Sequence, residues 1–472
     1  KTAYEISLGL VGSEMCIRDR IKTMQYIEQL GPDNRDLSMF PGEYGLPYLG
    51  KTIEIVKDTL GYCNYHYEKY GPISRLDMVR NQRVLMCLGP EFNEAALFDP
   101  KGNFSAAGGY GSSLGTLYPE GMLVRDDKKH KRTRRASQPA FKNDALKTYV
   151  EMMNPIQERR IQDLPVNEEF IFYDNIQKTL MDVAAKVFLG LDERSPEAQK
   201  LNDTFERINK GLITPFPYDL PFSPFRKSLA ARQELRDFLT SNIPLRRGTD
   251  RKDMFSRYCN AQDEDGEYLE DVDIDGHIAF LLFAAFDTTT SALTNILYYL
   301  GKNPDWQEKV RNELFEVKNE MPTFDDMAEM TLTEYVFQET LRFYPSVMIL
   351  NRRTTRDVTI AGHDIPANTV IMLSPPFTHR MEEWWSNPHE FDPMRFSPER
   401  AEHKNHGFSY IPFGGGAHKC IGMHFAMMNA KLYLFRLLKN YKVTLRDNYN
   451  PKFMHVHLPR PIDGLPITLT RI

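Results

Sequence analysis

The stretch Phe413 to Gly422 reads FGGGAHKCIG. Its three consecutive glycines, Gly414 to Gly416, permit backbone conformations and close approaches that other residues do not adopt. Cys420 follows, and an apolar run of helical spacing, Met423 to Leu438, comes soon after it. A cysteine at a helix N-terminus lies among unpaired amides at the positive end of the helix dipole, which favours the thiolate over the thiol. The stretch therefore predicts a reactive thiolate beside a flat, glycine-lined surface.

The wider pattern around this cysteine distinguishes a cofactor site from the alternative, a buried structural cysteine after a glycine turn. The residues that satisfy F-x-x-G-x-x-x-C-x-G are Phe413, Gly416, Cys420 and Gly422. This pattern resembles the haem-binding signature of the cytochrome P-450 family, in which a cysteine thiolate is the axial ligand of haem iron. The resemblance implies that Cys420 is the metal ligand. It also implies a set of haem-binding residues around that cysteine: Phe413, Gly414, Gly416 and Gly422.

A second motif supports the resemblance. Glu339 and Arg342 form E-x-x-R on a predicted helix that ends before Pro345, and this spacing puts both side chains on one helix face. Such a pair alone is more often a surface ion pair. In the family, a downstream arginine, here Arg395, completes a Glu-Arg-Arg network that braces the cysteine loop. The resemblance implies that these three residues are structural supports and not catalysts.

The third motif lies in the apolar stretch 273–303, which predicts one long helix. Ala284 to Thr289 reads AAFDTT and resembles the family's A-G-x-D/E-T-T, with Ala285 where the family usually has glycine. The resemblance implies that Asp287 and Thr288 are the catalytic acid and alcohol that relay protons to dioxygen. The alternative is that Thr288 only bonds back to a carbonyl of its own helix.

Four more side chains are implied to bind the haem propionates, which are anionic and favour Arg and His donors. They are His130, Arg134, Arg352 and His418. The first two belong to a basic run, 128–135 (KKHKRTRR), which predicts a helix. The exposed part of this run is either a solvated face or a docking surface for an acidic electron donor.

The resemblance implies a mainly α fold with a minor β-rich part, the cytochrome P-450 fold, with a long central helix across a haem pocket. It implies a haem-thiolate monooxygenase that carries haem b and inserts one oxygen atom from O2 into a hydrophobic organic substrate by hydroxylation or epoxidation. Two electrons are expected from a separate ferredoxin or flavodoxin and its NAD(P)H reductase, since no proper G-x-G-x-x-G motif follows a strand. The alternatives are a peroxide-dependent peroxygenase and a non-catalytic haem protein for sensing or electron transfer.

Family position also identifies the residues expected in the pocket wall, which are mostly apolar and imply a terpenoid, steroid-like or fatty substrate. They are Phe280, Phe283, Ala284, Met348 and Leu350, with the loop near Tyr110. The Gly/Ser-rich stretch 108–115 and the segment 212–225, which contains four prolines, are predicted to be loops. The second of these either guards the entrance, touches a membrane surface or packs as an ordinary surface loop.

Composition sets the remaining limits. With 41% hydrophobic residues, 26% charged residues and a net charge of −5, the chain can bury a large core and is a poor candidate for binding nucleic acid along its length. Five scattered cysteines are typical of reduced thiols in a cytosolic protein. The longest uninterrupted apolar run, Ile278 to Phe286, is far shorter than the ~20 residues of a membrane span. We therefore expect a soluble, bacterial-type, cytoplasmic monomer without a transmembrane anchor.

Domain organisation is expected to be simple. Residues 1–20 (KTAYEISLGLVGSEMCIRDR) resemble a translated sequencing-adapter artefact, the alternative being a genuine disordered N-terminus. No linker divides the rest, so residues 21–472 are expected to form a single cytochrome P-450 domain.

Local signals predict two helix starts. Apolar spacing predicts a helix over 174–189, with Asp174 as its N-cap and Gly190 as its stop. Thr331 and Glu334 form a capping box, which predicts the start of the E-x-x-R helix.

Overall fold

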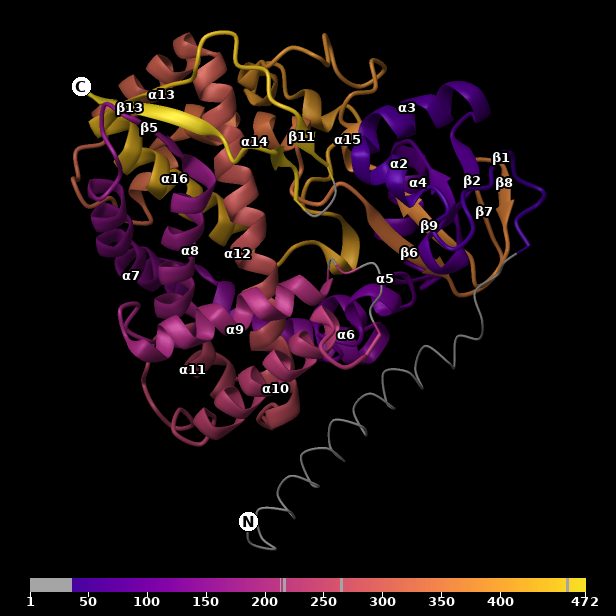
Figure 1. Cartoon of the computed structure of the whole chain (residues 1–472), viewed down its shortest axis with the longest axis horizontal. Coiled ribbons are helices and arrows are strands. Elements are labelled where there is room, and N and C mark those ends of the chain that lie inside the picture. The colour runs from indigo at the N-terminus through magenta and orange to yellow at the C-terminus, as the bar shows by residue number, and fades with distance from the viewer. Residues whose placement is uncertain (1–35, 213, 215–217, 264–265, 456–457) are drawn as a thin grey trace, which may run out of the picture.

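The computed structural model describes residues 36–472 except 213, 215–217, 264–265 and 456–457 (Figure 1). The segment 1–20, interpreted above as an artefact, lies outside the described residues, so that interpretation stays a prediction.

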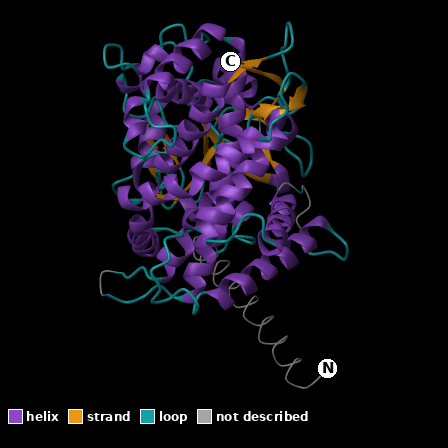
Figure 2. Cartoon of the chain, turned by 90° about the vertical axis from the view of Figure 1, so that its left-hand side faces the viewer, coloured by secondary structure: helices purple, strands orange, loops and turns teal. Residues whose placement is uncertain are grey.

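Helices dominate the fold, and short strands occupy a smaller part (Figure 2), which confirms the predicted fold class. The helices are α2 (Thr52–Lys57), α3 (Thr59–Tyr70), α4 (Pro90–Phe98), α5 (Ala106–Leu114), α6 (Asp127–Ser137), α7 (Asn143–Gln162), α8 (Phe172–Leu189), α9 (Pro196–Leu212), α10 (Pro224–Asn242), α11 (Met254–Cys259), α12 (Asp271–Lys302), α13 (Pro304–Glu316), α14 (Thr331–Phe343), α15 (Pro375–Thr378) and α16 (Met423–Asn440). The strands are β1 (Gly42–Glu43), β2 (Ile73–Met78), β3 (Gln82–Cys87), β4 (Phe104–Ser105), β5 (Glu169–Ile171), β6 (Leu350–Thr354), β7 (Val358–Ile360), β8 (His363–Ile365), β9 (Val370–Leu373), β10 (Tyr441–Thr444), β11 (Phe453–Met454), β12 (Arg460–Pro461) and β13 (Pro466–Arg471).

The largest sheet has the strand order β1-β2-β3-β9-β6-β4 and lies to one side of the helical part (Figure 1). Its strand β9 is apolar and fully buried, as an interior strand requires. Strand β6 pairs antiparallel with β9, in the register Arg352 opposite Ile371. This pairing fixes the position of β6, whose residues Leu350 to Arg352 reach the functional site.

Helix α12 is the central element of the core. It has 32 residues, about 48 Å at 1.5 Å per residue, and most of its middle is buried. The predicted helix over 273–303 is confirmed to within two residues at each end. By length and composition α12 is the one helix in the described part of the chain that could cross a membrane, and 67% of its most apolar window is buried inside the protein. That degree of burial is typical of a core helix.

The structure confirms the predicted end of helix α8 and corrects its predicted start. Gly190 ends the helix in a left-handed conformation, with φ of 64°. The helix begins earlier than predicted, at Phe172, and Ile171 occupies the N-cap position without a side-chain cap. Asp174 therefore lies within the first turn, where a carboxylate still favours the positive end of the helix dipole.

The capping box predicted for α14 is wrong. Thr331 is the first helical residue, and no side chain of the N-cap residue closes the helix. Instead Glu313, on α13, accepts hydrogen bonds from the backbone N–H of Leu332 at 2.5 Å and of Thr333 at 2.9 Å. Glu334 pairs with Lys431 of α16 at 2.7 Å. A carboxylate from a neighbouring helix thus satisfies the free amides, which local spacing does not reveal.

The loop predicted over 108–115 is also wrong, because α5 covers most of it. The side chain of Ser105 accepts from the N–H of Gly108 at 2.7 Å and caps the helix. A methyl group added at Gly109 would lie 2.8 Å from the backbone of Asn351 and Arg352 in β6. The glycines that weaken this helix intrinsically are therefore required by its close packing on the sheet.

Of the segment 212–225 predicted as a loop, the described residues 214 and 218–223 confirm the prediction, since none of them is helical. Leu212 still belongs to α9, and Pro224 begins α10.

Replacing Gly109 by alanine tests the packing of α5 on β6. Alanine has the higher helix propensity by about 1 kcal/mol, so Gly109→Ala in a loosely packed helix would stabilise the protein. Because the added methyl group overlaps the β6 backbone, we expect a loss of about 1–3 kcal/mol in the free energy of unfolding, measured by denaturant titration. Ser112→Ala, at an exposed position of α5, is the control and should cost nothing.

Candidate active site

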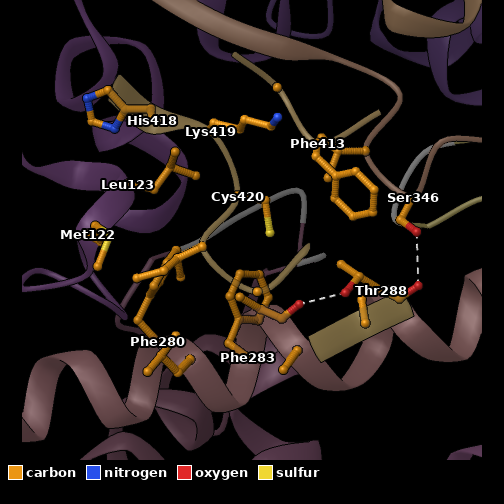
Figure 3. A pocket seen from close by; sticks show the side chains of 18 of the residues that line it. Met122, Leu123, Phe280, Phe283, Thr288, Ser346, Phe413, His418, Lys419 and Cys420 are labelled. Carbon is orange, nitrogen blue, oxygen red and sulfur yellow. Dashed lines mark hydrogen bonds between the residues drawn. The ribbon is translucent and has the colours of Figure 1, made fainter. Parts of the chain in front are cut away.

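A cavity of about 560 Å³ lies between α12, α6, β6 and the loop that precedes α16. The structure brings almost all predicted site residues to its wall. They are His130, Arg134, Asp287, Thr288, Arg352, Phe413, Gly414, His418, Cys420 and Gly422. Gly416 is the exception, because it does not line the cavity. Figure 3 shows the sulfur of Cys420 pointing into the space between its loop and α12.

Gly416 instead allows the cysteine loop to pass its neighbour. Its φ is 60°, and a Cβ built there would lie 1.7 Å from the carbonyl oxygen of Leu97 on α4. The backbone N–H of Cys420 donates to the carbonyl of Phe413 at 2.9 Å and closes the loop. Glycine is therefore required at position 416 for the loop path, and not for contact with a bound group.

The Cys420 thiol is accessible because it faces the cavity, although it lies deep inside the molecule. Burial raises the pKa of this thiol above its ordinary value, and the N–H of Gly422 and the guanidinium of Arg134 act in the opposite direction. The predicted preference for thiolate at a helix N-terminus is thus outweighed by desolvation in the protein alone. A bound metal cation would reverse this balance, because a coordinating thiol is deprotonated.

The predicted Glu-Arg-Arg network is confirmed. Arg342 donates to Glu339 in a bidentate pair at 2.7 and 2.9 Å, and Arg395 lies 3.4 Å from the same carboxylate. All three side chains are buried. Arg342 also donates to the carbonyl of His379 at 2.8 Å, and Nε2 of that histidine accepts from the N–H of Ile411 at 2.9 Å. Because Ile411 immediately precedes the cysteine loop, the network braces that loop.

The four predicted propionate-binding residues lie on one side of the cavity. The rings of His130 and His418 stack with centroids 3.8 Å apart. Burial lowers the pKa of His130 to about 3, helped by His418 and Arg134, so this imidazole is neutral. Its Nε2 is buried and has no hydrogen-bond partner among the described residues. An unpartnered buried nitrogen beside two arginines fits an anionic ligand that accepts hydrogen bonds here.

Sequence reasoning missed Asp126, which lies beside this group. Its carboxylate accepts from the hydroxyl of Ser105 at 2.5 Å and lies 3.6 Å from Nε2 of His418. The available signal was its position directly before the basic helix α6, where an acidic residue is favoured. Asp126 ties the start of α5 to the cysteine loop.

On the opposite wall, Thr288 and Asp287 of α12 make hydrogen bonds to different partners. The hydroxyl of Thr288 donates to the carbonyl of Ala284 at 2.7 Å, and Ser346 donates to the carbonyl of Thr288 at 2.9 Å (Figure 3). The hydroxyl hydrogen of Thr288 is thus used within its helix, as the alternative interpretation proposed, while its oxygen remains able to accept a hydrogen bond.

The Asp287 carboxylate points to a partner that the sequence did not reveal. Asn209, near the end of α9, donates to it at 3.0 Å. Burial raises the pKa of Asp287 from 3.8 to about 6, and the charge of Arg460 opposes this shift. Asn209 has no sequence signal, because it lies 78 residues from Asp287 and belongs to an ordinary amphipathic helix.

Fold and site together define a haem-thiolate enzyme of the oxygenase class. The model of the cytochrome P450 family matches residues 40–464, and the chain belongs to that family. The solved structure titled "Retinoic acid bound cyanobacterial CYP120A1" superposes with a TM-score of 0.84 at 28% identity, covering 92% of this chain and 99% of that one. Taxane 10-beta-hydroxylase of Taxus cuspidata is 27% identical, covering 91% of this chain and 89% of its own. Beta-amyrin 28-monooxygenase of Saponaria officinalis is 26% identical, covering 91% and 90%.

The cofactor of this family is haem b with a cysteine thiolate as axial ligand, and the residues present fit it. The cavity joins a thiol, an unpartnered imidazole nitrogen and two arginines to an otherwise largely apolar wall. No group of three His, Cys, Asp or Glu side chains within the described residues is placed to hold a metal ion directly.

Removing Glu339 tests the brace. Glu339→Ala leaves the buried guanidinium of Arg342 without its carboxylate and removes one of the two carboxylates beside Arg395, which keeps Glu402, at a cost of about 3–5 kcal/mol. We expect this variant to purify without haem, measured as the ratio of Soret to protein absorbance. The control is Glu234→Ala, which breaks an exposed pair with Arg207 and should keep its haem. Normal haem content in Glu339→Ala would refute the structural role of the network.

The environment of Asp287 predicts a pH-dependent stability. Because the pKa of Asp287 is raised in the folded protein, the ionised carboxylate lowers the free energy of unfolding by about 3 kcal/mol above pH 6. Below pH 4 the carboxyl group is protonated in both the folded and the unfolded protein, so this loss disappears. Asp287→Asn should therefore stabilise the protein increasingly as the pH rises from 4 to 7. Thermal unfolding of both proteins across this range measures the difference. If the difference in unfolding temperature between the two proteins does not change with pH, Asp287 is not a buried acid with a raised pKa.

Proposed function

We propose that this cytochrome P450 monooxygenase oxidises an apolar, terpenoid-type substrate at a haem bound by Cys420. The observation that carries the proposal is the cavity itself, in which the thiol of Cys420 points into the space in front of α12 and Asp287 and Thr288 line the wall. His130, Arg134, Arg352 and His418 would hold the propionates. When bound, haem supplies the binding and activation of O2. The chain's own residues supply the pocket, the proton path and the exclusion of water.

The substrate class follows from the wall that faces α12 and β6. The apolar side chains predicted for the pocket all line the cavity: Phe280, Phe283, Ala284, Met348 and Leu350. Such a wall favours an apolar molecule and excludes water from the reacting centre. The names of the relatives support a terpenoid, since they include a taxane hydroxylase, a beta-amyrin monooxygenase and a protein with bound retinoic acid. Hydroxylation or epoxidation of such a molecule is the proposed reaction.

Thr288 and Asp287 are proposed to serve different steps of proton delivery. The Thr288 oxygen accepts a hydrogen bond at the cavity wall and positions a water molecule there. Asp287, with a pKa near 6, exchanges protons readily near neutral pH and connects the cavity to α9 through Asn209. The separation of the two side chains requires water between them or a rotation of the carboxyl group.

Electrons are proposed to come from a separate ferredoxin or flavodoxin. Helix α6 turns His130 and Arg134 toward the cavity, while Lys128, Lys129 and Lys131 are exposed on its other side. A basic surface backed directly by the cofactor-binding residues suits an acidic partner and a short electron path. The structure describes three buried free thiols, Cys63, Cys87 and Cys259, which fit a reducing, cytoplasmic location, and we propose that the protein acts there as a monomer.

The absorption spectrum of the reduced, carbon-monoxide-bound protein tests the haem ligand, because it distinguishes a thiolate from an imidazole. The peroxygenase alternative is tested by turnover of a terpenoid panel with peroxide alone and with a ferredoxin and its reductase. We expect turnover with the reductase system. Turnover with peroxide only would favour the alternative.

Replacing Thr288 by alanine tests the proton path. Without the hydroxyl, protons reach the oxygen site less selectively, so we expect NAD(P)H consumption to continue while product per NAD(P)H falls about tenfold or more and peroxide is released. Thr290→Ala is the matched control: Thr290 makes the same bond to its own helix, at 3.0 Å, but does not line the cavity. Unchanged coupling in Thr288→Ala would refute the role of the hydroxyl.

A further inference from the structure

One corner of the largely apolar cavity carries polar groups that the protein leaves without partners. Tyr110, on α5, and Asn351, on β6, both line the cavity. The close approach of the two elements at Gly109 brings them together, and the Tyr110 hydroxyl accepts from the backbone N–H of Asn351 at 3.1 Å. We call these two side chains the polar corner.

The Tyr110 hydroxyl retains an unused donor. Tyr110 is only 8% exposed, so it is held firmly in the wall. Its oxygen is occupied as an acceptor, and no described residue accepts its hydrogen. A buried phenol normally finds a partner for its O–H group.

Neither the donor nor the acceptor of the Asn351 side-chain amide bonds a described residue. Its backbone is satisfied, since the N–H bonds Tyr110 and the carbonyl accepts from Arg352 at 2.8 Å. Its half-buried side-chain amide has no hydrogen-bond partner in the part of the chain that the structure describes. The corner thus presents an O–H donor together with an amide that both donates and accepts.

Three other polar side chains of the cavity wall, Ser113, Ser346 and Asp287, differ because they are engaged in hydrogen bonds. Ser113 donates to the carbonyl of Tyr110 at 3.0 Å, and Ser346 donates to the carbonyl of Thr288. Asp287 accepts from Asn209. These groups stabilise the wall, whereas the polar corner is open to a ligand.

We propose that Tyr110 and Asn351 form a subsite that binds one oxygen-bearing group of the substrate, a hydroxyl, carbonyl or carboxylate. The inference rests on the proposed function and narrows it: the substrate is apolar along most of its length and polar at one point. A purely apolar molecule would leave the buried groups unpaired, which a site of this kind discriminates against. The corner therefore determines which part of the molecule reaches Thr288.

The test uses the holoenzyme and small probes that bind the haem directly, so the natural substrate need not be known. The nitrogen of a 1-alkylimidazole binds haem iron, so its chain extends into the cavity from a fixed point. We would titrate 1-alkylimidazoles of increasing chain length that end in a methyl group or in a hydroxyl group, following the Soret shift. The proteins are the wild type, Tyr110→Phe, Asn351→Leu and the control Ser112→Ala, which removes an exposed hydroxyl of α5 outside the cavity wall.

At the chain length that reaches the corner, the wild type and Ser112→Ala should bind the hydroxyl-terminated probe about tenfold more tightly than the methyl-terminated one. Tyr110→Phe and Asn351→Leu should each lose most of this preference and bind the methyl-terminated probe within about twofold of the wild type. A wild type without preference at any length, or a preference that survives both substitutions, would overturn the proposal. The reduced carbon-monoxide spectrum of the same samples shows separately whether the haem-thiolate assignment holds.

Discussion

The site depends on one constraint: a cysteine must be presented to an internal cavity by the loop that precedes α16. Burial raises the pKa of the Cys420 thiol and so opposes the thiolate, which a cation bound in front of it would favour. The backbone bond from Cys420 to Phe413 and the glycine at position 416 define the loop's path. The buried carboxylate of Glu339, with Arg342 and its bonds to neighbouring carbonyls, holds that path in place. Buried ion pairs contribute little net stability, but breaking one is costly. Such a pair is therefore suited to holding the cysteine loop in a fixed position.

The parts of this arrangement that were predicted correctly are those in which adjacent residues carry the information. The glycine-cysteine loop, the E-x-x-R pair and the extent of α12 all follow from spacing within a single element. Arg395 and the histidine-arginine group needed the family resemblance, since nothing in composition connects residues so far apart. The structure confirms that the histidine-arginine group lies around one cavity and that Arg395 joins Glu339 in the buried network, and the roles of these residues remain the proposals made above.

The wrong predictions for α14 and α5 have a common physical origin. In each case a contact with a residue far away in the sequence determines the local structure. Glu313 caps α14 from another helix, so the local capping box is not used. The glycines of α5 indicate a loop when considered alone, but they permit contact with β6 that compensates for their weak helix propensity. Asn209 and Asp126 escaped notice for the same reason, because each acquires its role only from a tertiary contact.

Helix α12 shows how the core and the chemistry constrain each other. Its buried residues pack the largest apolar cluster of the molecule, yet Asp287 lies among them with its pKa raised by that same burial. A carboxyl group in this position is useful for moving protons near neutral pH and is destabilising for the fold. Asn209 bonds it without adding a charge, so the raised pKa is preserved while the side chain is held. The hydrogen bond from α9 thus fixes the position of the acid on α12 without removing the cause of its raised pKa.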